Sequence, residues 1–167
     1  MQIRRQQQLS LDQALQKARH YCSYQERCHS EVKEKLYGFG LRKSDVEEAL
    51  SRLIEENYLN EERFALQYTS GKFRIKQWGR IKIKAELKNK QISHYCVIAA
   101  LDEIDDRKYK ETLHRLAVKR WNSIKGEGIN LYVKMTKTRD YLLLKGYESN
   151  LIAMEIRSLA EKQKGAG

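Results

Sequence analysis

The chain has 167 residues, which is enough for one ordinary domain or for a few small units that share a core. Lys and Arg number 33 against 22 Asp and Glu, giving a net charge of +11, and 41% of the residues are hydrophobic, as in a polar globular protein. The chain has no proline, which β-sandwiches and barrels use in their turns, and no apolar run that could cross a membrane, so we set these classes aside.

The N-terminal residues and the cysteines indicate the cellular location of the protein. The first ten residues are basic and rich in glutamine rather than apolar, so we expect no secretory signal. The three cysteines form no close C-x-x-C pair, which argues against a disulfide scaffold. Together these features predict a reducing, cytoplasmic location.

Apolar residues recur at helical spacing along nearly the whole chain, and we predict helices that include residues 11–22, 60–74 and 107–125. The segment Arg80–Lys84 alternates as a strand does, but good helix formers follow it, so we predict a helix from Trp78 to Asn89. Helix starts are indicated by capping-box sequences and N-cap residues at Ser10, Ser23, Ser44, Asn60 and Ser93. Helix ends in left-handed conformation are predicted at Gly38, Gly40 and Gly146.

Three blocks of the chain repeat one apolar pattern at offsets 0, +5, +10 and +14. The blocks are Leu36, Leu41, Val46 and Leu50; Leu87, Ile92, Val97 and Leu101; and Leu142, Tyr147, Ile152 and Ile156. Another amphipathic helix precedes each block, so we predict an all-α protein of three tandem three-helix repeats. Because units this small gain stability by stacking, we expect an elongated, curved array.

The predicted boundaries are a basic, flexible N-terminus at 1–9, repeats at 10–58, 59–106 and 107–162, and a flexible tail at 163–167.

Basic residues are concentrated in the later repeats. Segment 72–90 has eight bases and one acid, and segment 107–167 has 14 bases and 6 acids. Segment 45–62 is acidic, which we interpret as an exposed helix face; a complement to the basic third repeat, or a surface that repels DNA, is the alternative. Such polarity predicts an anionic partner, most often nucleic acid.

The candidate partner or DNA contacts are the basic residues of two groups. The first group is Arg74, Lys76, Arg80, Lys84 and Lys88, and the second is Arg115, Lys119, Arg120, Lys134, Lys137 and Arg139. Arg80, Lys84 and Lys88 are spaced by four and form one stripe on a helix. The alternative is that both groups are simply solvated helix faces. Trp78 lies among lysines and either stacks on a base or anchors helix packing.

Enzymatic and metal chemistry have little support in the sequence. The chain lacks the phosphate loop, the serine nucleophile elbow and the H-E-x-x-H zinc motif. The cluster His20, Cys22, Cys28 and His29 fits no standard zinc spacing, and we expect these cysteines to pack between helices. We therefore expect no catalytic residues, no metal and no cofactor.

The middle and third repeats carry four recognisable stretches. They are Asn57–Ala65 (NYLNEERFA), Lys76–Ile81 (KQWGRI) and Glu86–Ile92 (ELKNKQI) in the middle repeat, and Lys137–Tyr147 (KTRDYLLLKGY) in the third. These stretches resemble the RecX family, the bacterial regulators of the RecA recombinase. The resemblance covers about residues 9–160. Gln91 departs from the family pattern, which usually has glycine there, so that turn needs another helix end or a left-handed glutamine.

The resemblance implies a curved, non-catalytic, three-repeat protein. RecX-like proteins lie in the groove of the RecA–DNA filament, inhibit its ATPase, extension and strand exchange, and in some cases bind DNA. We therefore expect a monomeric regulator of recombination, DNA repair and the SOS response whose partner is the RecA filament, with single- or double-stranded DNA contacted more weakly or indirectly, and no membrane. Inhibition or stimulation by this member stays open. The alternatives are a stand-alone DNA-binding protein of helix-turn-helix-like repeats and a helical scaffold.

Overall fold

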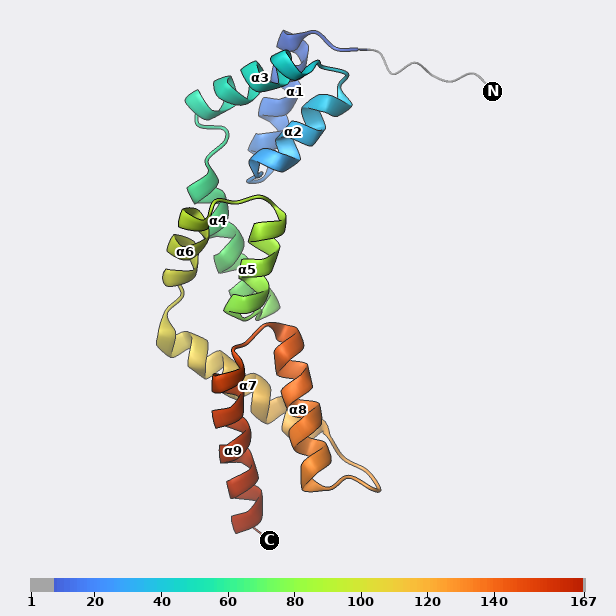
Figure 1. Ribbon diagram of the computed structural model, residues 1–167, viewed down its shortest axis with the longest axis vertical. Helices are drawn as coiled ribbons and strands as arrows, with labels where there is room; N and C mark the ends of the chain where they lie inside the picture. Colours follow the sequence, from blue (N-terminus) through green and yellow to red (C-terminus); the bar gives the residue numbers. More distant parts are fainter. Residues whose placement is uncertain (1–7, 167) are drawn as a thin grey trace, which may run out of the picture. The chain divides into compact units, whose positions relative to one another are not determined.

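The computed structural model describes residues 8–166, which form helices joined by short loops, without strands (Figure 1). The predicted flexible N-terminus and tail lie partly outside the described residues, at 1–7 and 167. The helices are α1 (Leu11–Tyr24), α2 (His29–Gly38), α3 (Lys43–Glu55), α4 (Glu61–Gly71), the π-helical turn η1 (Lys72–Lys76), α5 (Arg80–Asn89), α6 (His94–Asp102), α7 (Asp106–Ser123), α8 (Leu131–Lys145) and α9 (Ser149–Gly165). The all-α prediction is confirmed, and α9 extends into the predicted tail.

The chain falls into two compact units. The first comprises residues up to 67 together with 87–99, and the second comprises 68–86 together with residues from 100 onward. The boundary passes through α4, α5 and α6. The predicted repeat boundaries and the predicted curvature of the array stay predictions.

The first unit is built around α1, α2 and α3, which contact one another in pairs. Their apolar faces meet in one core, as the helical spacing predicted. Its buried members are Ala14, Leu15, Ala18, Cys22, Val32, Leu36, Leu41, Val46, Ala49, Leu53 and Leu59. The thiols of Cys22 and Cys28 are thus packing groups, and burial raises the pKa of the Cys22 thiol to about 11.

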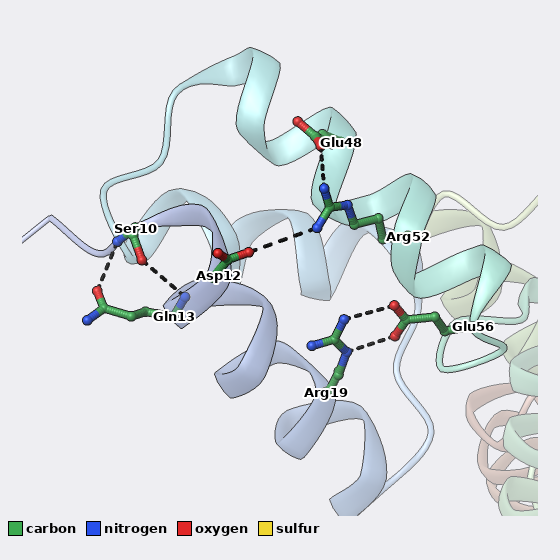
Figure 2. A network of polar contacts seen from close by, with 7 residues as sticks. All are labelled: Ser10, Asp12, Gln13, Arg19, Glu48, Arg52 and Glu56. Atoms are coloured by element: carbon green, nitrogen blue, oxygen red, sulfur yellow. Dashed lines mark hydrogen bonds and ion pairs between the residues drawn. The ribbon is translucent and has the colours of Figure 1, made fainter.

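Polar contacts tie the exposed side of α1 to α3 (Figure 2). The Arg19 guanidinium makes a two-pronged contact with the Glu56 carboxylate, at 2.7 and 2.8 Å. Arg52 pairs with Glu48 at 2.8 Å and approaches Asp12 at 4.0 Å. The hydrogen bond from Arg19 lowers the pKa of the Glu56 carboxyl. These acids of segment 45–62 thus lie on an exposed face with partners in their own unit, and such pairs add little stability.

The second unit contains a bundle of α7, α8 and α9, which also contact one another in pairs. Trp121 lies in its core with 4% of its surface exposed, and its indole N–H donates to Gln163 at 3.2 Å. Tyr109 and Tyr147 are fully buried in the same unit. Large aromatic side chains therefore supply much of the buried apolar area.

The repeated apolar pattern is a packing pattern. Of its twelve residues, eleven are buried and Leu50 is partly buried. In each block the residue before the +5 position is left-handed: φ is +84° at Gly40, +62° at Gln91 and +95° at Gly146. The amide of Ile92 donates to the Leu87 carbonyl at 3.1 Å, and that of Tyr147 to Leu142 at 3.2 Å. These are Schellman-type helix ends, and Gln91 adopts the strained geometry that glycine would adopt freely.

The predicted helix starts are right at three positions and wrong at two. Ser10 and Gln13 form a reciprocal capping box, shown in Figure 2, and the side chains of Asn60 and Ser93 accept amide hydrogen bonds at 2.8 and 3.4 Å. Ser23 instead lies inside α1, where its hydroxyl donates to the Arg19 carbonyl. The amide of Cys28 is capped by Glu31, at the true start of α2.

The other corrections shift boundaries by one or two residues. The N-cap of α3 is Arg42, with extended backbone, so Ser44 lies within the first turn rather than capping it. Gly38 is the last residue of α2 and takes no left-handed conformation. The helix predicted from Trp78 begins at Arg80, because the preceding residues turn sharply through a left-handed Gln77.

Glu31 anchors the start of α2 to the loop after α5 within the first unit. Its carboxylate accepts from Lys90 Nζ at 2.8 Å and from the Cys28 amide at 3.2 Å. The Ser30 hydroxyl donates to the Lys90 carbonyl at 3.0 Å. Burial tends to raise the pKa of Glu31, but the hydrogen bonds from Lys90 and the Cys28 amide outweigh it, so the pKa lies below the usual 4.5.

Replacing Gln91 with glycine is expected to raise the free energy of unfolding by about 0.5–1 kcal/mol, because the left-handed conformation costs a glutamine more than a glycine. Urea denaturation followed by circular dichroism measures the change. The control is Asn89→Gly, inside the last turn of α5, which should destabilise instead. Loss of stability in Gln91→Gly would contradict the left-handed assignment.

The Glu31 contacts are expected to weaken in acid. Because the pKa of Glu31 is lower in the folded chain than in the unfolded chain, its stabilisation is present above pH 4.5 and is lost as the pH falls through the folded-state value. Glu31→Gln should flatten this acid loss and, after solvent screening, cost under about 1 kcal/mol at pH 7. Exposed Glu34 on the same helix provides the matched Glu34→Gln control. An unchanged acid limb in Glu31→Gln would refute the assignment.

Candidate partner-binding surface

The start of α5 is joined to the end of α8 through backbone hydrogen bonds. The amide of Gly79 donates to the Lys145 carbonyl at 2.8 Å, and the amide of Ile81 donates to the Gly146 carbonyl at 3.0 Å. A helix start exposes amides without intrahelical partners and a helix end exposes carbonyls, so the two ends satisfy each other. The Lys145 ammonium also donates to the Lys76 carbonyl at 3.0 Å.

Glycine is required on both sides of this junction. A Cβ on Gly79 would overlap the backbone carbonyl of Gly146, and a Cβ on Gly146 would overlap the backbone and Cβ of Lys82. These neighbours are backbone or near-backbone atoms that cannot move aside cheaply. Gly79, the glycine of the Lys76–Ile81 motif, therefore permits close approach of two chain segments.

A buried tyrosine completes the junction. Tyr109 accepts a hydrogen bond from the Arg80 amide at 3.0 Å and donates one to Glu148 at 2.7 Å. Its ring lies between those of Phe73 and Tyr147, with centroids 5.8 and 5.1 Å away. Burial, and donation to Glu148, raise the pKa of the Tyr109 phenol far above its ordinary value, so it stays neutral.

Arg80, predicted as a partner contact, is held inside its own unit. Its guanidinium pairs with Asp106 at 2.7 Å and lies 4.0 Å from the centroid of the Tyr109 ring. This geometry indicates a structural role for Arg80. On the same helix Lys84 is half-buried and Lys88 is exposed.

Two further exposed cations of the first group lie on η1. Arg74 and Lys76 are both exposed there. Trp78 is half-buried, and the ammonium groups of Lys72 and Lys82 lie 4.9 and 4.5 Å from its ring. These contacts favour the packing interpretation of Trp78 over base stacking. The sequence analysis did not name Lys72 and Lys82 among the candidate residues. The four-residue spacing between Trp78 and Lys82 was the one pattern in the sequence that could have indicated their contact.

The second group divides in the same way. Exposed members are Arg115 and Lys119 on α7 and Lys137 and Arg139 on α8, with Arg139 3.4 Å from Asp140. Two members are held against rings instead. Arg120 lies 5.6 Å from the Tyr141 ring, and Lys134 lies 5.2 Å from the Trp121 ring.

Two further features bear on chemistry. Among residues 8–166, no three His, Cys, Asp or Glu side chains are gathered in a way that could hold a metal ion. In the same part of the chain, each helix is too short or too polar to span a membrane. The candidate residues are thus the exposed cations of these helices.

These observations define an all-helical protein of three-helix units with cationic surfaces. A family model described as "RecX, second three-helix domain" matches residues 60–101, which cover α4 to α6. The crystal structure of RecX from Lactobacillus salivarius superposes with a TM-score of 0.80 at 26% identity, over 89% of this chain and 96% of that one. A crystal structure of regulatory protein RecX gives 0.76 at 22% identity, over 87% and 70%, which supports the fold.

Curated relatives agree with the structures. Regulatory protein RecX of Clostridium perfringens (strain 13 / Type A) is 31% identical over 133 residues, covering 80% of this chain and 62% of the relative. Regulatory protein RecX of Bacillus cytotoxicus is 27% identical over 143 residues, covering 86% and 52%. The chain belongs to the RecX family. It spans between about half and three fifths of the length of these relatives.

Gly79→Ala is expected to lower the free energy of unfolding by about 1–3 kcal/mol, because the added methyl overlaps the Gly146 carbonyl and forces the two helix ends apart. Thermal unfolding followed by circular dichroism measures it. Gly71→Ala is the matched control, since a Cβ at Gly71 meets open space at the end of α4, and it should leave stability unchanged or raise it. Equal effects of the two substitutions would contradict the junction.

Proposed function

We propose that this protein regulates homologous recombination and DNA repair by binding the RecA–DNA filament and inhibiting its ATPase, extension and strand exchange. Membership of the RecX family, whose relatives carry the name regulatory protein, is the observation that carries this proposal. The surplus of exposed cations supports an anionic partner. The proposal includes a non-catalytic monomer that acts in the cytoplasm.

The proposed mechanism is occlusion. The exposed cations of the two groups contact recombinase carboxylates or DNA phosphates, and half-buried Lys84 adds to the first group. The exposed cations are Arg74, Lys76 and Lys88 in the first group, and Arg115, Lys119, Lys137 and Arg139 in the second. Arg80, Arg120 and Lys134 stabilise the fold through aromatic rings and support the surface indirectly. Contacts with several protomers at once multiply weak affinities through effective concentration.

The single-strand-DNA-dependent ATPase of the cognate RecA recombinase tests the function. We expect ATP turnover to fall when this protein is present well below one copy per protomer, because one bound regulator affects many protomers of a filament. Simple competition for DNA would need far more protein. Undiminished turnover at equimolar, folded protein would contradict the proposal.

Charge reversal then tests the surface. Arg74→Glu with Lys76→Glu should raise the concentration needed for half-inhibition by about tenfold or more, because two exposed cations on η1 become acids. Lys33→Glu with Lys110→Glu makes the same charge change at exposed positions outside both groups. Equal loss in both double variants would indicate that only net charge matters.

The stand-alone DNA-binding alternative has its own signature. If DNA binding explains the function, affinity for DNA without recombinase should be strong, and its logarithm should fall steeply with the logarithm of salt concentration, by about 0.9 per phosphate neutralised. Weak DNA binding together with strong inhibition supports the filament proposal.

A further inference from the structure

An open groove lies between α8 and α9 in the second unit. Its volume is about 580 Å³, and its floor and walls include Met135, Leu143, Ile152, Ile156 and Ala160. Figure 1 shows the two helices side by side, and they contact each other directly. All lining residues lie on α8 and α9, and none of them lies on α7. Helix α7 therefore packs against other parts of this helix pair.

The groove has the form of a seat for another helix. On α8 it is lined by Tyr132, Thr136, Arg139 and Leu143, which step by three and four and so share one face. The facing residues of α9 follow the same helical spacing. Two helices with apolar stripes turned to a common groove accept a third amphipathic helix, whose anchors then recur at i, i+3 or i+4, and i+7.

The charge around the groove specifies the occupant. Arg139, Arg157 and Lys164 line it, against one carboxylate, Glu161. Within the described residues Arg157 and Lys164 have no ion-pair partner, and Arg139 has only a 3.4 Å contact with the neighbouring Asp140. Cations beside an apolar floor match a helix that carries apolar anchors flanked by Asp or Glu.

Other occupants fit less well. A second copy of this chain would bring the same cations of α8 and α9 against each other, which costs free energy. Nucleic acid would find one aromatic side chain, Tyr132, in a groove whose floor is aliphatic, whereas bases are bound by stacking on aromatic rings.

We propose that the groove between α8 and α9 is a docking site for an acidic amphipathic helix of a partner protein. The apolar floor buries the partner's anchors, and Arg139, Arg157 and Lys164 pair with its carboxylates. This inference goes beyond the proposed function, because it concerns one surface of the isolated protein and is tested without recombinase or DNA.

The probe is a fluorescein-labelled helical peptide of about 16 residues with leucines at i, i+4, i+7 and i+11 and glutamates beside them. Fluorescence anisotropy with the full chain measures binding, and a second peptide carries lysine in place of every glutamate. We expect the acidic peptide to bind at least about tenfold more tightly than the basic one.

A charge swap makes the test specific. Arg139→Glu with Arg157→Glu should reverse the preference, so that the basic peptide binds more tightly than the acidic one. The matched control, Lys110→Glu with Lys125→Glu, changes the net charge equally at exposed positions that do not line the groove, and should keep the original preference. Circular dichroism and thermal unfolding confirm that both variants are folded.

The proposal would be overturned if the wild-type chain bound neither peptide, or if it bound both equally. It would also be overturned if the control variant reversed the preference as fully as the groove variant does, because net charge alone would then explain the binding. Finally, if sedimentation equilibrium showed a dimer that the groove variant dissociates, the groove would be assigned to a second copy of this chain.

Discussion

The second unit depends on one backbone junction, in which the start of α5 and the end of α8 supply each other's missing hydrogen bonds. Two glycines, Gly79 and Gly146, let the segments approach closely enough for this pairing. The junction in turn buries Tyr109, whose hydroxyl bonds both to the Arg80 amide and to Glu148. Since a buried, unpaired polar group costs free energy, every member of this network needs the others.

The contacts within the second unit divide its basic residues into those that are held by the fold and those that are available to a partner. Arg80 is held by Asp106 and by the Tyr109 ring, and Arg120 and Lys134 also lie against aromatic rings. A basic stripe in the sequence is therefore not automatically a binding surface. Charge excess measures the long-range field of the protein, whereas local contacts decide which side chains are free to bind.

The helices and the repeat were predictable because they depend on short-range spacing. Apolar residues at three- and four-residue intervals correctly indicated the helices and the core of the first unit. The capping prediction at Ser23 failed because burial of Cys22 continues α1 past a local pattern that would also start a helix. When two local signals compete, buried apolar area outweighs a single cap.

The sequence by itself determined the all-α class, the three repeated apolar blocks, the excess of positive charge and the resemblance to the RecX family. Only the tertiary structure decided that Gly79 faces Gly146, that Arg80 is taken up by Asp106, and that a basic-rimmed groove lies open between α8 and α9. The physical reason is distance along the chain. Helix spacing and caps act within a few residues, whereas these contacts join residues that are close only after the helices have packed.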